Sequence, residues 1–262
     1  MAEDFLLTKW YMDCVSDHGD AMIGYIARVQ WKSFALHYSS LVRTSPGKES
    51  VIETSLRAIA PPVVTNDGNG IQWIDDRLAV HGEWHRTAPA VDRTLYNDEH
   101  GTIRWHCVMP GASAVMKFRR EEVAGYGYVE RLEMSLPPWH LPIETLRWGR
   151  YVQHGESVVW LDWQGKFPLT AVFRNGSPVL KATVTDDAVR SEDGSVALTF
   201  TRGHVIRRGA IAETVLKNVP LIGIVLPERT LRMNEEKWLS RTGGQLPTGA
   251  PDGFTIHERV QI

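Results

Sequence analysis

Apolar and polar residues alternate with period two along most of the chain, and turn-forming residues interrupt the alternation at short intervals. Successive side chains of a strand point to opposite faces, so this alternation predicts half-buried β-strands. The first half contains these expected strands: Lys9–Val15, Ile23–Trp31, Phe34–Leu41, Ile71–Ile74, Leu78–His85, Gly101–Met109, Ala112–Phe118 and Gly125–Met134. The second half contains these: Arg150–Gln153, Val158–Gln164, Thr170–Arg174, Val179–Thr185, Val196–Thr201, Val205–Thr214, Arg229–Leu239 and Phe254–Val260.

Turn sequences separate the expected strands. Asn175-Gly176 is a favoured pair for a two-residue hairpin loop, and Pro110-Gly111 is expected to divide two further strands. Helical periodicity is scarce, and the expected helix is Glu49–Ala58, which lies between proline-containing breaks. The chain is therefore expected to be all-β with few short helices.

A proline-rich segment, Leu136–Pro142, divides the expected strands into two sets of about eight, a number found in small closed barrels that hold one ligand. We therefore expect domains at residues 1–140 and 141–262. The halves begin alike, since Trp10 and Trp148 each precede a glycine-containing turn and an apolar strand. This match indicates a weak internal duplication, although chance also explains it.

The charge balance limits the classes of partner. The chain has 29 Lys and Arg against 31 Asp and Glu, a net charge of −2, whereas a general nucleic-acid binder needs a basic face. The longest apolar stretch, Val219–Leu226, is far shorter than the ~20 residues of a membrane span. Residues Met1–Trp10 lack the features of a signal peptide, so Cys14 and Cys107 are expected to be reduced in a cytoplasmic protein.

Gly125–Met134 is the strand whose faces carry the clearest chemistry. One face combines a carboxyl group with aromatic and apolar residues: Tyr126, Tyr128, Glu130, Leu132 and Met134. Burial favours the neutral form of a carboxylic acid, and a neutral acid can donate a proton to a substrate. Two alternatives stay open: Glu130 is solvated on an outward face, or it is a core glutamate paired with an arginine.

Two other polar residues lie on strands rich in tryptophan. His106 shares a face with Arg104 and can serve as an acid–base partner or a structural histidine, while its neighbour Trp105 faces the other way. Asp162 alternates with Trp160 and is either a water-positioning group or a hydrogen-bond acceptor for the backbone or a tryptophan. Ten tryptophans in the chain favour either a filled core or the wall of a ligand pocket.

The sequence offers little for a metal or a cofactor. His81, Glu83 and His85 share a strand face, but such alternation is common on solvent-exposed strands. No Walker A sequence and no Gly-x-Ser-x-Gly elbow occurs, and Gly125-Tyr126-Gly127 does not open a helix. We therefore expect no metal and no cofactor.

Gly125–Glu130 resembles a motif of the hydroxyneurosporene synthase (carotenoid 1,2-hydratase) superfamily, in which Gly-x-Gly-Tyr is followed two residues later by an acid. Leu146–Arg150 and Val158–Trp163 resemble the tryptophan-rich strands of that family. The resemblance implies two lipocalin-like antiparallel β-barrels packed side by side, and cofactor-free chemistry on hydrophobic, unsaturated substrates. By the match, Tyr128 and Glu130 fall on the family's Tyr-x-Asp pair.

The leading hypothesis is a cofactor-independent acid–base enzyme, a hydratase, isomerase or cyclase, acting on a hydrophobic small molecule such as an isoprenoid or polyketide. Glu130 is expected to donate a proton, Tyr128 to orient it, and Asp162 or His106 to place a water. The expected substrate-binding residues are Trp105, Tyr126, Trp160, Trp148 and Met134. The alternatives are a non-catalytic carrier of an apolar lipid, isoprenoid or pigment, and a structural barrel with a filled core; the oligomeric state is left open.

Overall fold

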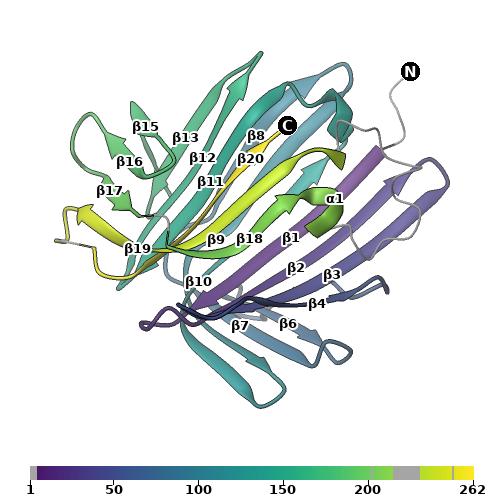
Figure 1. Ribbon diagram of the computed structural model, residues 1–262, viewed down its shortest axis with the longest axis horizontal. Helices are drawn as coiled ribbons and strands as arrows, with labels where there is room; N and C mark the ends of the chain where they lie inside the picture. Colours follow the sequence, from purple (N-terminus) through teal and green to yellow (C-terminus); the bar gives the residue numbers. More distant parts are fainter. Residues whose placement is uncertain (1–4, 202, 215–230, 250) are drawn as a thin grey trace. The chain divides into compact units, whose positions relative to one another are not determined.

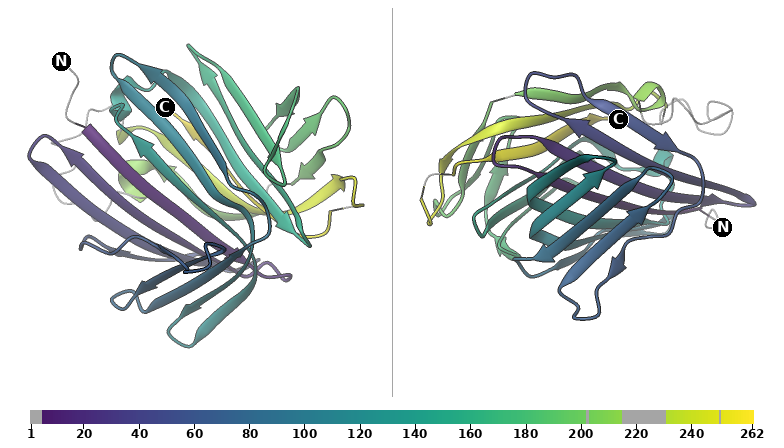
Figure 2. Two further views of the ribbon diagram at one scale, coloured as in Figure 1. Left: turned by 180° about the vertical axis from the view of Figure 1, so that it is seen from behind. Right: turned by 90° about the horizontal axis from the view of Figure 1, so that it is seen from below.

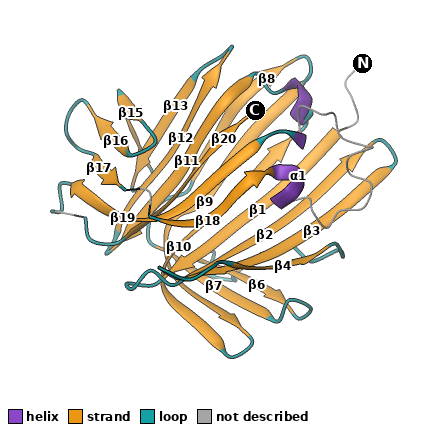
Figure 3. Cartoon of the chain, viewed as in Figure 1, coloured by secondary structure: helices purple, strands orange, loops and turns teal. Residues whose placement is uncertain are grey.

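The computed structural model describes residues 5–201, 203–214, 231–249 and 251–262. Antiparallel strands make up almost all of its regular structure, which confirms the expected all-β fold of two barrel-type sheets (Figures 1 and 3). The helical elements of the described residues are short: η1 (Pro138–His140) and α1 (Ile211–Thr214). None of the described helices has the length and apolarity that a membrane span requires.

The first sheet contains ten strands in the spatial order β4-β3-β2-β1-β10-β9-β7-β6-β5, with β8 paired to β9 beside β7. Its strands are β1 (Phe5–Val15), β2 (Ala21–Trp31), β3 (Phe34–Thr44), β4 (Val51–Ser55), β5 (Val63–Val64), β6 (Gly70–Asp75), β7 (Val80–Arg86), β8 (Val91–Asp98), β9 (Gly101–Phe118) and β10 (Glu121–Met134).

The second sheet also has ten strands, in the order β14-β13-β12-β11-β20-β19-β17-β16-β15, with β18 paired to β19. Its strands are β11 (Ile143–Gln153), β12 (Glu156–Gly165), β13 (Leu169–Arg174), β14 (Ser177–Val179), β15 (Ala182–Val184), β16 (Ala188–Ser191), β17 (Ala197–Phe200), β18 (His204–Ala210), β19 (Asn234–Gln245) and β20 (Phe254–Gln261). The antiparallel course of neighbouring strands can be followed in Figure 2.

The two sheets repeat one topology. In each, the first strand pairs with both the second and the last strand, and the ninth strand is shared by the seventh and the eighth. The chain correspondingly divides into two compact units, one made of Met1–Ser45 with Val51–Pro137 and the other of Pro46–Ser50 with Pro138–Ile262. The two halves therefore share the order in which their strands pair, and this similarity is clearer than the similarity of their sequences.

The tryptophan match between the halves does not coincide with that repeat. Trp10 packs in the core cluster of the first unit with Met12. Trp148 points away from the core residues Tyr151 and Trp160 of the second unit, because it lies an odd number of positions from Tyr151 on β11 and is not directly opposite Trp160. The two tryptophans thus occupy opposite faces relative to their own cores.

Three glycines make space for tryptophan rings that pack in the two cores. A β-carbon at Gly24 would overlap the ring of Trp73, and one at Gly82 would overlap that of Trp84. In the second unit, a β-carbon at Gly149 would overlap Trp160. These three rings are almost completely buried, so they fill the two cores and do not line a wide cavity.

The expected helix at Glu49–Ala58 is wrong. Residues Val51–Ser55 form β4, which pairs with Ser39–Arg43 of β3. The β-branched residues Val51, Ile52 and Thr54 favour an extended backbone, and pairing with β3 supplies the hydrogen bonds that a short helix would otherwise make.

The expected turn at Pro110-Gly111 is also wrong, because β9 runs unbroken from Gly101 to Phe118. Its register against β10 shifts around Val129, where β9 contributes extra residues. Proline and glycine are tolerated at such irregularities, which bend a strand without ending it. The shift has a consequence for side-chain direction: Cys107 and Met109 point to opposite faces of the sheet.

Other boundaries differ from the expectations. β8 and β16 were not expected, since the mostly exposed side chains of β8 do not alternate cleanly. Val179–Thr185 contains the end of β14 and the separate strand β15, because Lys181 adopts a positive φ between them. Val205–Thr214 ends in α1, and the expected strand at 229–239 begins at Asn234, residues 229–230 lying outside the described part.

Candidate functional site

The outward side of the first sheet carries the predicted acid. Glu130 and Tyr128 lie on β10, directly opposite Tyr11 and Asp13 of β1. Across the other edge of β10, Glu130 lies opposite Cys107 of β9. We call these five residues, together with Trp105 and Tyr25, the Glu130 face. Its side chains point away from core residues such as Met12 and Val129, yet they are buried; Glu130 itself is 8 % exposed.

Two hydrogen bonds hold the carboxyl group of Glu130. The indole Nε1–H of Trp105 donates to Oε2 over 2.6 Å, and the phenol of Tyr128 donates to the same oxygen over 2.7 Å. Trp105 reaches Glu130 because it is diagonal to it across the β9–β10 pair, where Leu132 is its direct partner. The structure therefore brings together three of the predicted site residues, Glu130, Tyr128 and Trp105.

The neighbours of the carboxyl group keep their protons. Burial raises the pKa of Tyr128 well above its ordinary value, and the nearby Cys107 and Glu130 raise it further. Burial likewise raises the pKa of the Cys107 thiol. At neutral pH, Tyr128 is consequently a hydrogen-bond donor to Glu130, and Cys107 is a thiol.

Aromatic rings surround this group on the same face. The ring of Tyr11 meets that of Tyr128 edge-on at a centroid distance of 5.9 Å and that of Tyr25 at 5.2 Å. Edge-to-face contacts of this kind fix ring orientation and contribute about 0.5–1.5 kcal/mol beyond area burial. The rings leave the carboxyl group in an aromatic, water-poor environment.

Asp13 is a residue of this face that the sequence did not single out. It is fully buried and directly opposite Tyr128, so it is diagonal to Glu130 across the β1–β10 pair. The β-carbons of such diagonal residues lie about 7–8 Å apart. The signal was the alternation of Tyr11 and Asp13 in an expected strand, but only the pairing of β1 with β10 places Asp13 beside Tyr128.

Tyr126 and Met134 share the direction of Glu130 but lie at a distance along β10. Tyr126 is half-buried opposite Val15, and Met134 is buried opposite Leu7 near the other end of β1. Both were predicted to bind substrate, and both stay predictions.

The structure separates His106 from the Glu130 face. His106 lies directly opposite Arg131, so its ring is on the other side of the sheet. Its Nδ1 is 2.8 Å from Asp92 and its Nε2 is 3.3 Å from Glu133. These contacts fit a structural histidine of an ion-pair cluster, and they do not bring His106 near the carboxyl group of Glu130.

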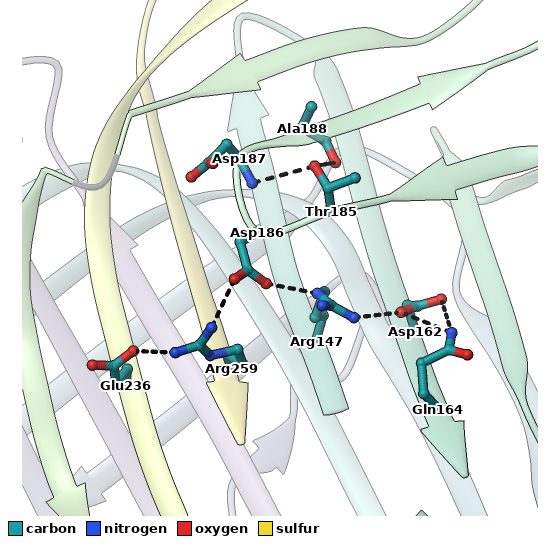
Figure 4. Close-up of polar contacts among 9 residues, drawn as sticks. All are labelled: Arg147, Asp162, Gln164, Thr185, Asp186, Asp187, Ala188, Glu236 and Arg259. Carbon is teal, nitrogen blue, oxygen red and sulfur yellow. Dashed lines mark hydrogen bonds and ion pairs between the residues drawn. The ribbon is translucent and has the colours of Figure 1, made fainter. Parts of the chain in front are cut away.

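Asp162 belongs to an ion-pair chain of the second unit (Figure 4). Thr170 donates to its carboxylate over 2.7 Å, Gln164 over 3.3 Å and Arg147 over 3.3 Å. Arg147 and Arg259, paired on β11 and β20, both bind Asp186, and Arg259 continues to Glu236. Among the described residues, the partners of Asp162 are thus the side chains of Arg147, Thr170 and Gln164, and not the backbone amide or tryptophan N–H expected for a structural role. The water-placing role of Asp162 stays a prediction.

Trp160 and Trp148 lie on opposite faces of the second sheet. Trp160 is a core residue whose ring stacks on that of Phe200 at 5.5 Å. The ammonium group of Lys237 lies 5.3 Å from the ring centre of Trp148. The structure thus gives Trp160 a packing role, while the predicted substrate contact of Trp148 stays a prediction.

Metal ligands and a disulfide are not assembled in the described residues. His81 contacts Glu83 at 3.1 Å on the solvent-accessible face of β7, and within the described ranges no group of three or more potential ligands is arranged around a common point. Cys14 and Cys107 are both buried without a disulfide.

The raised pKa of Tyr128 predicts how stability varies with pH. Below pH 10, folded and unfolded chains both keep this proton; above it, the unfolded chain loses the proton while the folded chain retains it. Stability is therefore expected to fall as the pH rises above 10, and Tyr128→Phe should reduce that fall. Urea unfolding at pH 9 and pH 11 measures the change in unfolding free energy with pH for the wild type and for Tyr128→Phe. An equal change in the two proteins would contradict a buried, protonated Tyr128.

Comparison with known proteins finds similarity in structure. No protein-family model and no curated protein matches the sequence. CghA aligns at a TM-score of 0.53 and 10 % identity over 99 % of this chain and 89 % of CghA. Kievitone hydratase from Nectria haematococca aligns at 0.51 and 11 % identity, over 99 % and 89 %. A Nitrosomonas europaea protein assigned to AttH aligns at 0.50 and 11 %, over 98 % and 93 %.

These alignments span the whole described architecture. They show that this chain has the fold of CghA, of kievitone hydratase and of the Nitrosomonas europaea protein, with both ten-stranded sheets included in the covered length.

Proposed function

We propose that this chain is a cofactor-independent acid–base enzyme, a hydratase, isomerase or cyclase, that acts on a hydrophobic, unsaturated small molecule. The observation that carries the proposal is the buried carboxyl group of Glu130, held by Trp105 and Tyr128 among aromatic rings. A positioned carboxylic acid contributes about 10²–10⁴-fold to a proton-transfer step.

In a hydration, Glu130 gives its proton to one carbon of a C=C bond, and the π electrons form the new C–H bond. The neighbouring carbon becomes cationic and accepts a lone pair from water. The aromatic ring of Tyr11 stabilises this cation by about 2 kcal/mol where water is excluded, an amount that accounts for about 30-fold in rate. Positioning of the substrate supplies the remainder.

We assign the complementary base to Asp13. Its carboxylate accepts the proton that the attacking water loses, and the proton returns to Glu130 through solvent, so the sum is the addition of one water. In an isomerisation, Asp13 removes a proton from the carbon next to the cation instead. The β-carbons of diagonal residues such as Asp13 and Glu130 lie about 7–8 Å apart, which brings the two carboxyl groups within reach of one substrate.

The structural neighbours support this class of reaction. Kievitone hydratase is named for a hydration, and CghA is known in complex with Sch210972. Together with the Gly-x-Gly-Tyr-x-Glu segment, they favour membership of the hydroxyneurosporene synthase-like superfamily and a substrate such as an isoprenoid or polyketide. We further propose that residues 1–140 and 141–262 are its two domains and that it acts in the cytoplasm without a nucleic-acid partner.

Deuterium labelling tests the proposal. The purified protein is extracted with organic solvent, and the recovered compound is incubated with fresh protein in D₂O and analysed by mass spectrometry. We expect a carbon-bound deuterium in the product, because the proton donated by Glu130 comes from solvent. A compound that is bound and recovered without deuterium would identify a carrier instead.

Asp13→Asn separates the two carboxyl groups. The variant keeps the acid and loses the base, so net hydration is expected to fall at least 100-fold while Glu130 still exchanges deuterium into the substrate. Asp17→Asn, in the exposed β1–β2 turn, is the matched control. Full hydration by Asp13→Asn would remove Asp13 from the mechanism without affecting the role of Glu130.

A further inference from the structure

The second unit contains an open groove of about 510 Å³ that has no residue in common with the Glu130 face. It runs over β16, β17 and β19. Three small residues, Ala188, Thr199 and Gly243, are directly opposite one another on these strands and form part of its lining. Gly243 has no side chain to fill the space above β19, and this contributes to the depth of the groove.

Two arginines give the groove a positive charge. Arg190 lies two residues beyond Ala188 on β16, and Arg241 lies two residues before Gly243 on β19, so they stand at opposite ends of the small-residue row. Both are exposed, and neither forms an ion pair with any residue that the structure describes. The guanidinium of Arg241 lies 5.4 Å from the ring centre of Phe254. The lining also contains one acidic residue, Asp187.

The wall beside Asp187 is fixed by contacts outside the groove. The carboxylate of the preceding residue, Asp186, is bound by Arg147 at 2.7 Å and by Arg259 at 2.8 Å (Figure 4). The carbonyl of Asp187 accepts the backbone N–H of Phe200 at 2.9 Å. Because these bonds hold the segment between β15 and β16, the groove is formed before any ligand arrives.

We propose that this groove binds an amphipathic organic anion, in which a carboxylate or sulfonate contacts Arg190 and is attracted by the second positive charge of the groove, that of Arg241. The apolar body of the ligand lies over Ala188 and Gly243. The volume falls in the range of small-molecule sites, and the combination of apolar lining with a few placed charges is typical of them. Guanidinium groups bind planar anions through two parallel hydrogen bonds, which selects this charge over a neutral polar group.

A matched pair of probes tests the charge. Calorimetric titration of the full chain with 1-naphthaleneacetate and with its neutral amide, 1-naphthaleneacetamide, should show at least tenfold tighter binding of the anion. Arg190→Gln combined with Arg241→Gln should weaken the anion at least tenfold and leave the amide unchanged. Arg28→Gln, an exposed arginine on β2, controls for the loss of charge alone.

A variant with a larger side chain in the groove tests whether the probes bind there. The nearest atom to a β-carbon at Gly243 is Thr199 Oγ1 at 3.2 Å, so Gly243→Val adds bulk to the groove with little backbone strain. It should weaken both probes, with thermal unfolding as the check that the variant folds. Glu130→Gln should bind the anion with wild-type affinity. A negative result for anion binding in the groove is therefore distinguishable from a negative result for the proposed reaction at Glu130. Equal affinities for the two probes, or no saturable binding of either, would overturn the proposal.

Discussion

Glu130→Gln is expected to lower turnover by about 10²–10⁴-fold, because the amide keeps the shape and the acceptor oxygen of the side chain but has no acidic proton. Trp105 and Tyr128 can still donate to the Gln side-chain oxygen, so the fold of the Glu130 face should persist. Turnover of the extracted compound, followed by mass spectrometry, gives the rate. Ligand affinity, measured separately, should change far less than turnover.

Glu133→Gln is the matched control for this experiment. Glu133 lies three residues away on the same strand, but it is on the other face and contacts His106 and Arg131. Its replacement should leave turnover within a few fold of wild type. If the Glu130 and Glu133 variants both turn over normally, Glu130 is not the proton donor.

Gly149→Ala is expected to destabilise the second unit by about 3 kcal/mol, the upper part of the usual range for overpacking a core. The added methyl group would overlap the ring of Trp160 and crowd His257, and both are buried. Trp160 cannot retreat easily, since its other side stacks on Phe200. Urea unfolding followed by far-UV circular dichroism measures the change.

Two further variants test whether the destabilisation arises from the contact between residue 149 and Trp160. Gly243→Ala, on an open face of the same sheet, should cost much less, because the nearest atom is 3.2 Å from the new β-carbon. Trp160→Phe should relieve part of the Gly149→Ala penalty when the two are combined, since residues in contact couple. A Gly149→Ala protein with wild-type stability would mean that the ring moves freely, contrary to a packed core.

Most strands, and the placement of Tyr128 and Glu130 on one face, could be predicted from the sequence because they depend only on residues close together in the chain. Period-two alternation located most strands, and it placed Tyr128 and Glu130 on one face. Asn175-Gly176 gave its hairpin correctly, with both residues at positive φ. These features need only the chain geometry of neighbouring residues, which the sequence specifies directly.

What the sequence missed depends on pairing between distant segments. β4 was mistaken for a helix because a segment of this length has ambiguous periodicity until β3 pairs with it. Asp13 gained significance only through the register of β1 on β10. The register shift of β9, which sets the directions of Cys107 and Met109, was hidden by a Pro-Gly pair that usually marks a turn.

The pairing of first and last strands has a consequence for biosynthesis. β1 makes its ladder with β10, and Tyr11 lies opposite a residue about 120 positions later. At a ribosomal speed of about 5–20 residues per second, the N-terminal strand waits roughly 6–24 s before its partner is made. During this interval only the hairpins of β1 to β4 and the later local pairs can form. The second unit repeats the delay, since β11 waits for β20. Nascent chains of this protein should therefore depend on chaperones more than those of a fold closed by sequential hairpins.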